Sequence, residues 1–166
     1  MSGRLDGKIA LVTGIGAGIG QGVALRFAAE GATVIGCDIN PSTSAATVEV
    51  ARRDGLEITS VHPVDLTRPD DAARFVAVAA PHGRIDVLVN AAAIAPHIAP
   101  GAEMDYEAQW RPTIAGEVDL VFLACQAAWP QLVASGHGSI INFASVNSFR
   151  GSRRRPAPPP RHATRS

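Results

Sequence analysis

An apolar run that leads straight into a glycine-rich segment and then a helical pattern constrains the fold of this chain more than any other feature. The run is KIALVTG (8–14), the glycine-rich segment is TGIGAGIG (13–20), and apolar residues at helical spacing continue to Gly31. A short, wholly apolar run is typical of a strand that is buried on both faces. The order therefore predicts a β-strand, a tight turn, and an α-helix packed on that strand.

The same alternation repeats along the chain. Strands are predicted at residues 8–14, 32–38, 56–65, 85–93 and 138–145, and helices at 17–30, 43–54, 69–80 and 105–135. Pro112 and Pro130 are predicted to disturb the last helix. Strands that alternate with helices are joined by crossover connections, which make neighbouring strands parallel. The predicted fold class is therefore α/β, with a doubly wound parallel sheet of five strands.

Composition fits one globular domain and argues against several classes of protein. The chain has 166 residues, of which 46% are hydrophobic and 18% charged, and its formal net charge is zero. Such neutrality gives little attraction to nucleic acid or to a membrane surface. Cys37 and Cys125 lie in apolar runs, as buried thiols in a reducing compartment do. We expect a cytoplasmic protein with no metal site, no membrane span and no specific nucleic-acid partner.

The glycine-rich segment has the spacing of a dinucleotide-binding loop. Gly14 permits the sharp exit from the first strand, Gly18 lets the backbone approach a pyrophosphate, and Gly20 lets the helix pack closely on the sheet. Backbone N–H groups at the helix start, including that of Ile19, would then face the phosphates. The alternative is a glycine-rich turn that serves only as a tight connection.

Asp38 ends the second predicted strand, twenty residues after Gly18. A carboxylate at this position can accept hydrogen bonds from both hydroxyls of an adenosine ribose and repel a 2′-phosphate. The next residues, Ile39 and Asn40, and the loop residues 15–17 supply no cation for such a phosphate. We therefore expect NAD as the cofactor, with NADP less favoured. The alternative interpretation of Asp38 is a solvated residue at the end of a strand.

The order and spacing of four motifs resemble the short-chain dehydrogenase/reductase family. The motifs are TGIGAGIG (13–20), Asp65-Leu66 after the third strand, DVLVNAAA (86–93) on the fourth, and NFAS (142–145) on the fifth. The resemblance implies a Rossmann-like, NAD(P)-dependent oxidoreductase, usually a homo-oligomer. Such an enzyme moves a hydride between a nicotinamide and a small-molecule alcohol or carbonyl substrate. The NAD(P)-binding domain is expected to occupy residues 1–151.

The resemblance also assigns roles outside the glycine-rich segment. Asp65 and Leu66 would contact the adenine ring, and Ile39 would contribute to the same cofactor site. Asn90 and Ala91 would line the middle of the cofactor. Ser145 would be a catalytic residue that hydrogen-bonds the substrate oxygen. The alternatives are structural: a strand-end cap for Asp65, a loop-anchoring amide for Asn90, and an ordinary strand-end hydroxyl for Ser145.

Two departures from the family pattern concern the cofactor pocket and the long helix. The family's Asn-Asn-Ala-Gly is replaced by Asn90 and three alanines, residues 91–93. Glu117 stands where the long helix of the family usually carries an asparagine. A carboxylate there either alters the pKa and geometry of a proton relay or simply faces solvent, and the sequence leaves both interpretations open.

A third departure concerns the catalytic pair. The family uses a Tyr-x-x-x-Lys motif about a dozen residues after the serine, in which the tyrosine is the general acid/base and the lysine lowers its pKa. The 166 residues contain one tyrosine, Tyr106, and one lysine, Lys8, and neither follows Ser145. We therefore expect the chain as written to be inactive. The alternative function is a catalytically incompetent dinucleotide-binding remnant or an interaction subunit.

The segment 152–166 differs in composition from everything before it. It holds five arginines and four prolines, and the prolines rule out the helix that would carry the catalytic pair. We expect a disordered Arg/Pro-rich tail, and our hypothesis is a frameshift near Gly151 that leaves the C-terminal part of the family fold missing. A basic arm for acidic partners and a proline-rich ligand for a groove-binding module are the alternatives.

Overall fold

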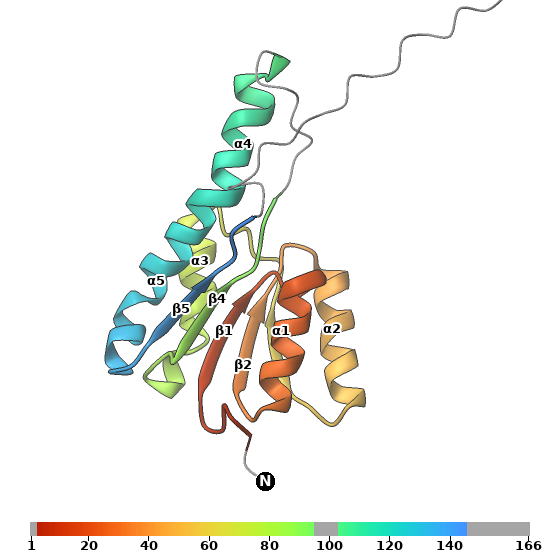
Figure 1. The fold of residues 1–166 in the computed structure, drawn as a ribbon, viewed down its shortest axis with the longest axis vertical. Helices are drawn as coiled ribbons and strands as arrows, with labels where there is room; N and C mark the ends of the chain where they lie inside the picture. Colours follow the sequence, from red (N-terminus) through yellow and green to blue (C-terminus); the bar gives the residue numbers. More distant parts are fainter. Residues whose placement is uncertain (1–2, 95–102, 146–166) are drawn as a thin grey trace, which may run out of the picture.

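The protein is built on a five-stranded parallel sheet with helices on both faces (Figure 1). The computed structural model describes residues 3–94 and 103–145, so the predicted tail at 152–166 lies outside the described residues. The strand order is β3-β2-β1-β4-β5, with β1 at the centre. The chain builds outward from β1 to β3 and then crosses over to place β4 on the other side of β1. The predicted doubly wound α/β fold is confirmed.

All five predicted strands are present, and each is shorter than the apolar run that predicted it. They are β1 (Ile9–Thr13), β2 (Thr33–Cys37), β3 (Ile58–Val61), β4 (Val87–Asn90) and β5 (Ser139–Asn142). The prediction that the third strand extends to residue 65 is wrong. The ladder between β2 and β3 ends at the pair Cys37 and Val61, and the loop to the next helix follows it. Within that loop the backbone N–H of Val64 still donates to the carbonyl of Asp38, 2.9 Å away.

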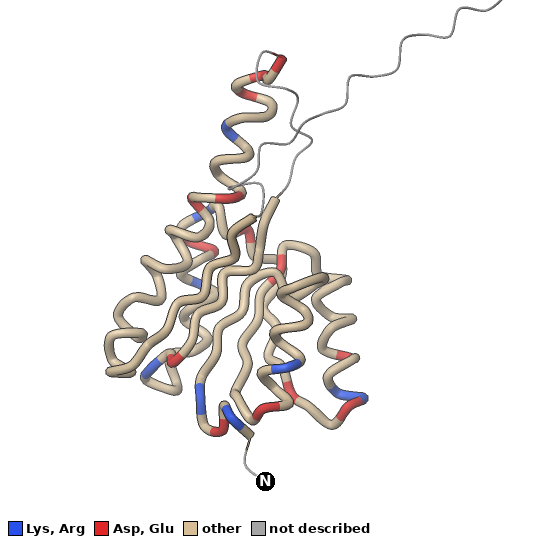
Figure 2. Tube along the Cα trace, in the orientation of Figure 1, with Lys and Arg blue, Asp and Glu red and all other residues tan. Residues whose placement is uncertain are grey.

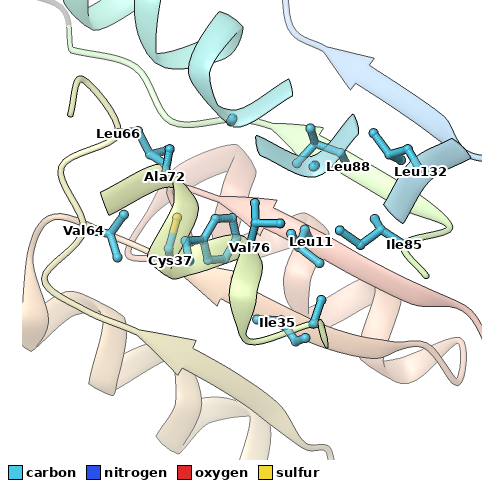
Figure 3. Close-up of a cluster of buried hydrophobic side chains, with 14 of the residues drawn as sticks. Leu11, Ile35, Cys37, Val64, Leu66, Ala72, Val76, Ile85, Leu88 and Leu132 are labelled. Atoms are coloured by element: carbon cyan, nitrogen blue, oxygen red, sulfur yellow. The ribbon is translucent and has the colours of Figure 1, made fainter. Parts of the chain in front are cut away.

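Two pairs of helices cover the two faces of the sheet. On one face lie α1 (Gly18–Ala29) and α2 (Pro41–Arg53), and on the other lie α3 (Pro69–Ala77) and α5 (Leu120–Ala134) (Figure 1). Successive strand residues point to opposite faces, so Leu11 packs with α3 and α5 while its neighbours on β1 pack with α1. Figure 3 shows the cluster around Leu11 on the α3–α5 side.

Helix α2 begins two residues earlier than predicted, and the sequence carries the signals for it. Asn40 caps the helix, because its side-chain oxygen accepts from the backbone N–H groups of Ser42 at 3.0 Å and Thr43 at 3.3 Å. Pro41 occupies the first helical position, where its missing N–H leaves no bond unmade. The helix predicted at 69–80 is shorter than expected. It ends at Ala77 as α3, and a short 3₁₀ turn, η1 (Ala80–His82), follows it.

The long helix predicted at 105–135 is interrupted twice. Two π-helical segments, η3 (Tyr106–Trp110) and η4 (Ala115–Asp119), flank the short helix α4 (Arg111–Ile114) and precede α5. The first π segment ends just before Pro112, as the predicted disturbance requires, whereas Pro130 lies inside α5 without ending it. Figure 2 shows that α5 carries no charged residue. In the ranges 3–94 and 103–145, no helix combines the length and hydropathy needed to cross a bilayer.

A buried carboxylate joins three segments at the amino ends of the strands. Asp86 accepts hydrogen bonds from the backbone N–H of Ile9 at 2.8 Å and from the hydroxyl of Ser135 at 3.0 Å. Arg84 Nε lies 3.2 Å and His137 Nε2 3.0 Å from its oxygens. Burial by itself would raise the pKa of Asp86, but the hydrogen bonds from Ile9, Ser135 and Arg84 outweigh that effect and lower it. The charged form of Asp86 therefore stabilises the fold.

Candidate functional site

A cleft of about 260 Å³ opens at the carboxyl ends of the strands. It is the position where the strand order reverses, between β1 and β4, and ligands of doubly wound sheets bind at such a position. Residues from the loops after β1, β2, β3 and β4, the last residue of β2 and the first residue of α5 line it: Gly14, Ala17, Cys37, Asp38, Ile39, Val64, Asp65, Leu66, Thr67, Ala91, Ala92, Ala93, Ile94 and Leu120. Among the described residues, no group of His, Cys, Asp and Glu is arranged to hold a metal ion.

The three glycines predicted to shape the loop each meet a different steric condition. Gly14 has φ +71°, and a Cβ there would lie 2.7 Å from the Cα of Ala92 in the loop after β4. Gly18 has φ +58° and open space where a Cβ would be, so nothing in the described structure blocks a ligand from approaching its backbone. A Cβ on Gly20 would lie 2.6 Å from the carbonyl carbon of Gly14, so only glycine allows α1 to pack this closely.

The loop between β1 and α1 is held by the strand beside it. The backbone N–H groups of Gly14 and Ile15 donate to the carbonyl of Cys37, at 2.8 and 3.1 Å. The next N–H, that of Gly16, donates to Asp38 Oδ2 at 2.7 Å. A Cβ on Gly16 would lie 2.7 Å from the same oxygen and would also overlap the Thr43 hydroxyl. Gly16 is thus a site residue that the sequence analysis missed, since it was considered only as a position without a cation.

The first turn of α1 presents unsatisfied donors beside the cleft. Ala17 is the residue before the helix, it lines the cleft, and no side chain in the described part of the chain caps the helix there. The first N–H groups of a helix have no intrahelical acceptor, and the helix dipole adds partial positive charge at the same end. The backbone at Gly18 to Gly20 is therefore suited to an anionic group such as a pyrophosphate. The side chain of Ile19 is 58% exposed, so only its backbone is a candidate for binding.

Asp38 lies at the edge of the cleft with its carboxylate already oriented. Its Oδ2 accepts from Gly16 and its Oδ1 accepts from the backbone N–H of Asn40 at 2.8 Å. An ionised carboxylate has about four acceptor positions, so about two remain for other donors, enough for the two hydroxyls of a ribose. Ile39 beside it also lines the cleft. None of the described residues that line the cleft is Lys or Arg.

The far end of the cleft is formed by the residues after β3. Asp65 and Leu66, both predicted to contact adenine, line it. The carboxylate of Asp65 also accepts from the N–H and the hydroxyl of Thr67, at 3.0 and 2.7 Å. These contacts are the capping contacts expected if Asp65 had a structural role. Asp65 makes them while also lining the cleft. Leu66 is 5% exposed and belongs to the core on the α3–α5 side.

Asn90 and Ala91, predicted as neighbours in the cofactor site, lie in different environments. Asn90 is 3% exposed and does not line the cleft; its amide donates to Asn142 Oδ1 at 2.8 Å and to Cys125 Sγ at 3.4 Å. These contacts join the end of β4 to α5 and β5, so the amide has a structural role although neither partner lies in a loop. Ala91 does line the cleft, and its N–H donates to the hydroxyl of Thr13 at 3.0 Å.

Thr13 is a second residue whose role the sequence analysis did not recognise. Its side chain is fully buried, and its hydroxyl accepts from the N–H groups of both Ala91 and Ala92, each at 3.0 Å. It thereby fixes the loop after β4 against the end of β1. The signal was a hydroxyl residue at the end of an apolar strand, where a buried oxygen needs a partner from the neighbouring loop.

Several other residues named from the sequence do not line the cleft, among them Gly18, Ile19 and Gly20 at the start of α1. Ser145 lies three residues past the end of β5 and is exposed, so the prediction that the strand reaches it is wrong. Glu117 is exposed on η4, which favours its solvent-facing interpretation. Tyr106 is 61% exposed at the start of η3. Lys8 lies at the opposite end of the sheet, where its Nζ is 2.9 Å from His137 Nε2.

Cys37 lines the cleft with an uncharged thiol and not with a reactive thiolate. It lines the cleft at the end of β2, and burial strongly raises the pKa of its thiol. A thiol held in its neutral form is a poor nucleophile. Cys37 is therefore not expected to react with a ligand. The groups of the site that can hydrogen-bond a ligand are the N–H groups at the start of α1 and the oxygens of Asp38.

Comparison with known proteins identifies the family of the chain. Residues 8–157 match the family model described as short chain dehydrogenase. The chain is 38% identical over 146 residues to D-threitol dehydrogenase of Mycolicibacterium smegmatis, which covers 86% of this chain and 54% of that protein. The chain thus spans about half the length of this curated relative.

Solved structures give the same result. A short-chain type dehydrogenase/reductase from Mycobacterium ulcerans superposes with a TM-score of 0.83 at 34% identity, over 90% of this chain and 55% of that one. Actinorhodin polyketide ketoreductase, solved with NADPH, superposes with a TM-score of 0.81 at 27% identity, over 90% and 57% of the two chains. With the family model spanning most of its length, this chain belongs to the short-chain dehydrogenase/reductase family of oxidoreductases, which bind nicotinamide dinucleotides.

Proposed function

We propose that the cleft binds NAD. The observation that carries the proposal is the pairing of an uncapped helix start with an oriented carboxylate, Asp38, on either side of one loop. Gly14, Gly18, Ile19 and Gly20 would hold the pyrophosphate through the backbone. Asp38 and Ile39 would hold the adenosine ribose, Asp65 and Leu66 the adenine, and Asn90 and Ala91 would shape the middle of the site. The free thiols Cys37 and Cys125 suit a reducing cytoplasm.

The preference for NAD over NADP follows from charge. A 2′-phosphate would bring negative charge against Asp38, and no Lys or Arg among the described lining residues could offset it. Two like charges about 4 Å apart near a protein surface repel by several kcal/mol in magnitude. The NAD affinity should therefore exceed the NADP affinity by at least roughly tenfold, a difference of about 1.4 kcal/mol.

Replacing Asp38 with serine should reduce this discrimination. In Asp38→Ser we expect NAD to bind roughly tenfold more weakly, because a charge-assisted bond to the ribose is lost, while NADP binds no worse. Isothermal titration of both cofactors measures the ratio. Asp54→Ser, an exposed carboxylate at the end of α2, is the control and should leave the ratio unchanged. An unaltered NAD-to-NADP ratio in Asp38→Ser would rule out this role for the carboxylate.

The activity of the family is oxidoreduction of small alcohols or carbonyl compounds, in which the nicotinamide ring carries the hydride. Ser145 would hydrogen-bond the substrate oxygen, but a proton must also move to or from that oxygen. Neither Tyr106 nor Lys8 lies at the cleft, and Lys8 is held by His137 at the other end of the sheet. We propose that a polypeptide of these 166 residues binds the dinucleotide without turning it over.

This second part has its own test. The purified 166-residue chain should bind NAD in titration calorimetry and show no change in absorbance at 340 nm with a broad panel of alcohols and ketones. The same panel with a full-length short-chain dehydrogenase controls the assay. Sustained NADH formation that copurifies with the chain through two different columns would show that another group supplies the proton transfer.

A further inference from the structure

A buried hydroxyl on α2 contacts the glycine-rich loop and does not line the cleft. Thr47 is fully buried, and its Oγ1 lies 2.8 Å from the carbonyl oxygen of Ile15. The same oxygen accepts from the side-chain amide of Gln21 on α1, 2.9 Å away. One hydroxyl therefore joins α1, α2 and the loop between β1 and α1.

The single proton of Thr47 has two possible acceptors. One is the carbonyl of Thr43, four residues earlier on the same helix, at 3.2 Å, and the other is the carbonyl of Ile15 at 2.8 Å. A threonine inside a helix commonly bonds the carbonyl four residues before it. Here the shorter contact is the one to the loop, so the proton is directed away from the helix and toward Ile15.

The peptide group between Ile15 and Gly16 is consequently held at both ends. Its carbonyl accepts from Thr47, and its N–H donates to Asp38 Oδ2 at 2.7 Å. Because a peptide group is planar, fixing the direction of the carbonyl also fixes the direction of the N–H. Thr47 therefore sets the orientation of the donor that holds the Asp38 carboxylate, although it touches neither Asp38 nor the cleft.

We propose that Thr47 is a positioning residue for dinucleotide recognition, acting through the Ile15–Gly16 peptide on both the phosphate-binding loop and Asp38. The inference rests on the proposed function and deepens it. Loss of the hydroxyl frees one end of the peptide, so one of the two backbone donors that orient Asp38 is no longer fixed. The carboxylate then favours a ribose diol over a 2′-phosphate less strongly. Both the affinity for NAD and its excess over that for NADP should fall.

The experiment compares Thr47→Val with Thr47→Ser. Valine keeps the shape of threonine but leaves the Ile15 carbonyl without its donor, so NAD should bind roughly tenfold more weakly, with a smaller NAD-to-NADP ratio. Serine keeps the hydroxyl and should bind within about threefold of the parent. Ser44→Ala is the matched control, because Ser44 is equally buried on α2 but bonds Ser60, at 2.6 Å, and not the loop. It should lower stability without changing the cofactor ratio.

A second measurement does not depend on any ligand. Amide hydrogen exchange at Gly16 should be faster in Thr47→Val than in the parent and in Thr47→Ser, and unchanged in Ser44→Ala. If Thr47→Val does not fold, Gln21→Met is the substitute, because it removes the other contact to the hydroxyl. It should change the NAD affinity, the NAD-to-NADP ratio and the Gly16 exchange rate in the same direction but by less. A parent chain that binds no dinucleotide defeats the proposed function, whereas normal affinity, ratio and Gly16 exchange in Thr47→Val defeat this inference. Equal losses in the serine and valine variants defeat it too.

Discussion

Replacing Gly20 with alanine is expected to destabilise the protein by roughly 3 kcal/mol or more. The added Cβ would overlap the carbonyl oxygen of Gly14 and lie 2.6 Å from its carbonyl carbon. These are backbone atoms of the loop, and the loop is bonded to the end of β2, so it cannot move aside without breaking those bonds. Because domains of this kind unfold with only about 5–15 kcal/mol, a urea titration should show a large fall in the midpoint.

Gly22, two residues further along the same helix, is the matched control. A Cβ there meets no atom within 4 Å, so Gly22→Ala should stabilise α1 by about 0.5–1 kcal/mol through its helix propensity. Opposite signs for two identical substitutions on one helix would show that close packing, not glycine as such, is required. Equal effects at the two positions would contradict the packing argument.

Asp86→Asn is expected to destabilise the protein by roughly 3 kcal/mol at neutral pH. One carboxylate oxygen accepts from Ile9 and the other from Ser135, and both lie near Arg84 or His137. Whichever oxygen is replaced by the NH₂ group, the hydrogens of that group will face hydrogen-bond donors. Those donors then have no acceptor. The side chain of Asp86 is 1% exposed, so water cannot take over the lost bonds.

The same residue predicts how stability depends on pH. The pKa of Asp86 in the fold lies below its value in the unfolded chain, so the unfolded chain binds more protons in the acid range. The contribution of Asp86 is complete above the unfolded pKa, about 4, and is lost as the pH falls through the folded pKa. Urea titrations between pH 3 and pH 7 should therefore show a shallower acid slope in Asp86→Asn. Asp54→Asn, an exposed control, should follow the parent within about 0.5 kcal/mol; a parent-like slope in Asp86→Asn would exclude the assignment.

The sequence predicts the five-stranded α/β sheet and the glycine-rich loop between β1 and α1, because those depend on local patterns. Gly14, Gly20 and Asp38 lie at fixed distances along the chain from the ends of β1 and β2, so a motif places them without knowledge of the rest. Their geometry agrees with the steric roles expected of the two glycines. The start of α2 could also have been predicted from a cap, Asn40, and a first-turn proline, Pro41, although the helix was expected only from residue 43.

What the sequence could not supply depends on contacts between distant segments. Thr47 and Ile15 are 32 residues apart, and Asp86 and Ile9 are 77 apart, so neither pair has a local signature. The two π-helical segments were equally hidden, because each has only 5 residues, too few to show a change in the spacing of apolar residues. Asn90 shows the same limit, since its bond to Asn142 could be recognised only once β4 and β5 were paired.

The central position of β1 has a consequence for biosynthesis. β1 leaves the ribosome first, yet one of its two neighbours is β4, whose Val87 pairs with Ala10. At ordinary translation rates, the 77 residues from Leu11 to Val87 take about 4 to 15 s to make. During that interval the edge of β1 that will pair with β4 stays unpaired in the nascent chain. We expect chaperone binding during synthesis to be strongest before the codons for β4 have been read.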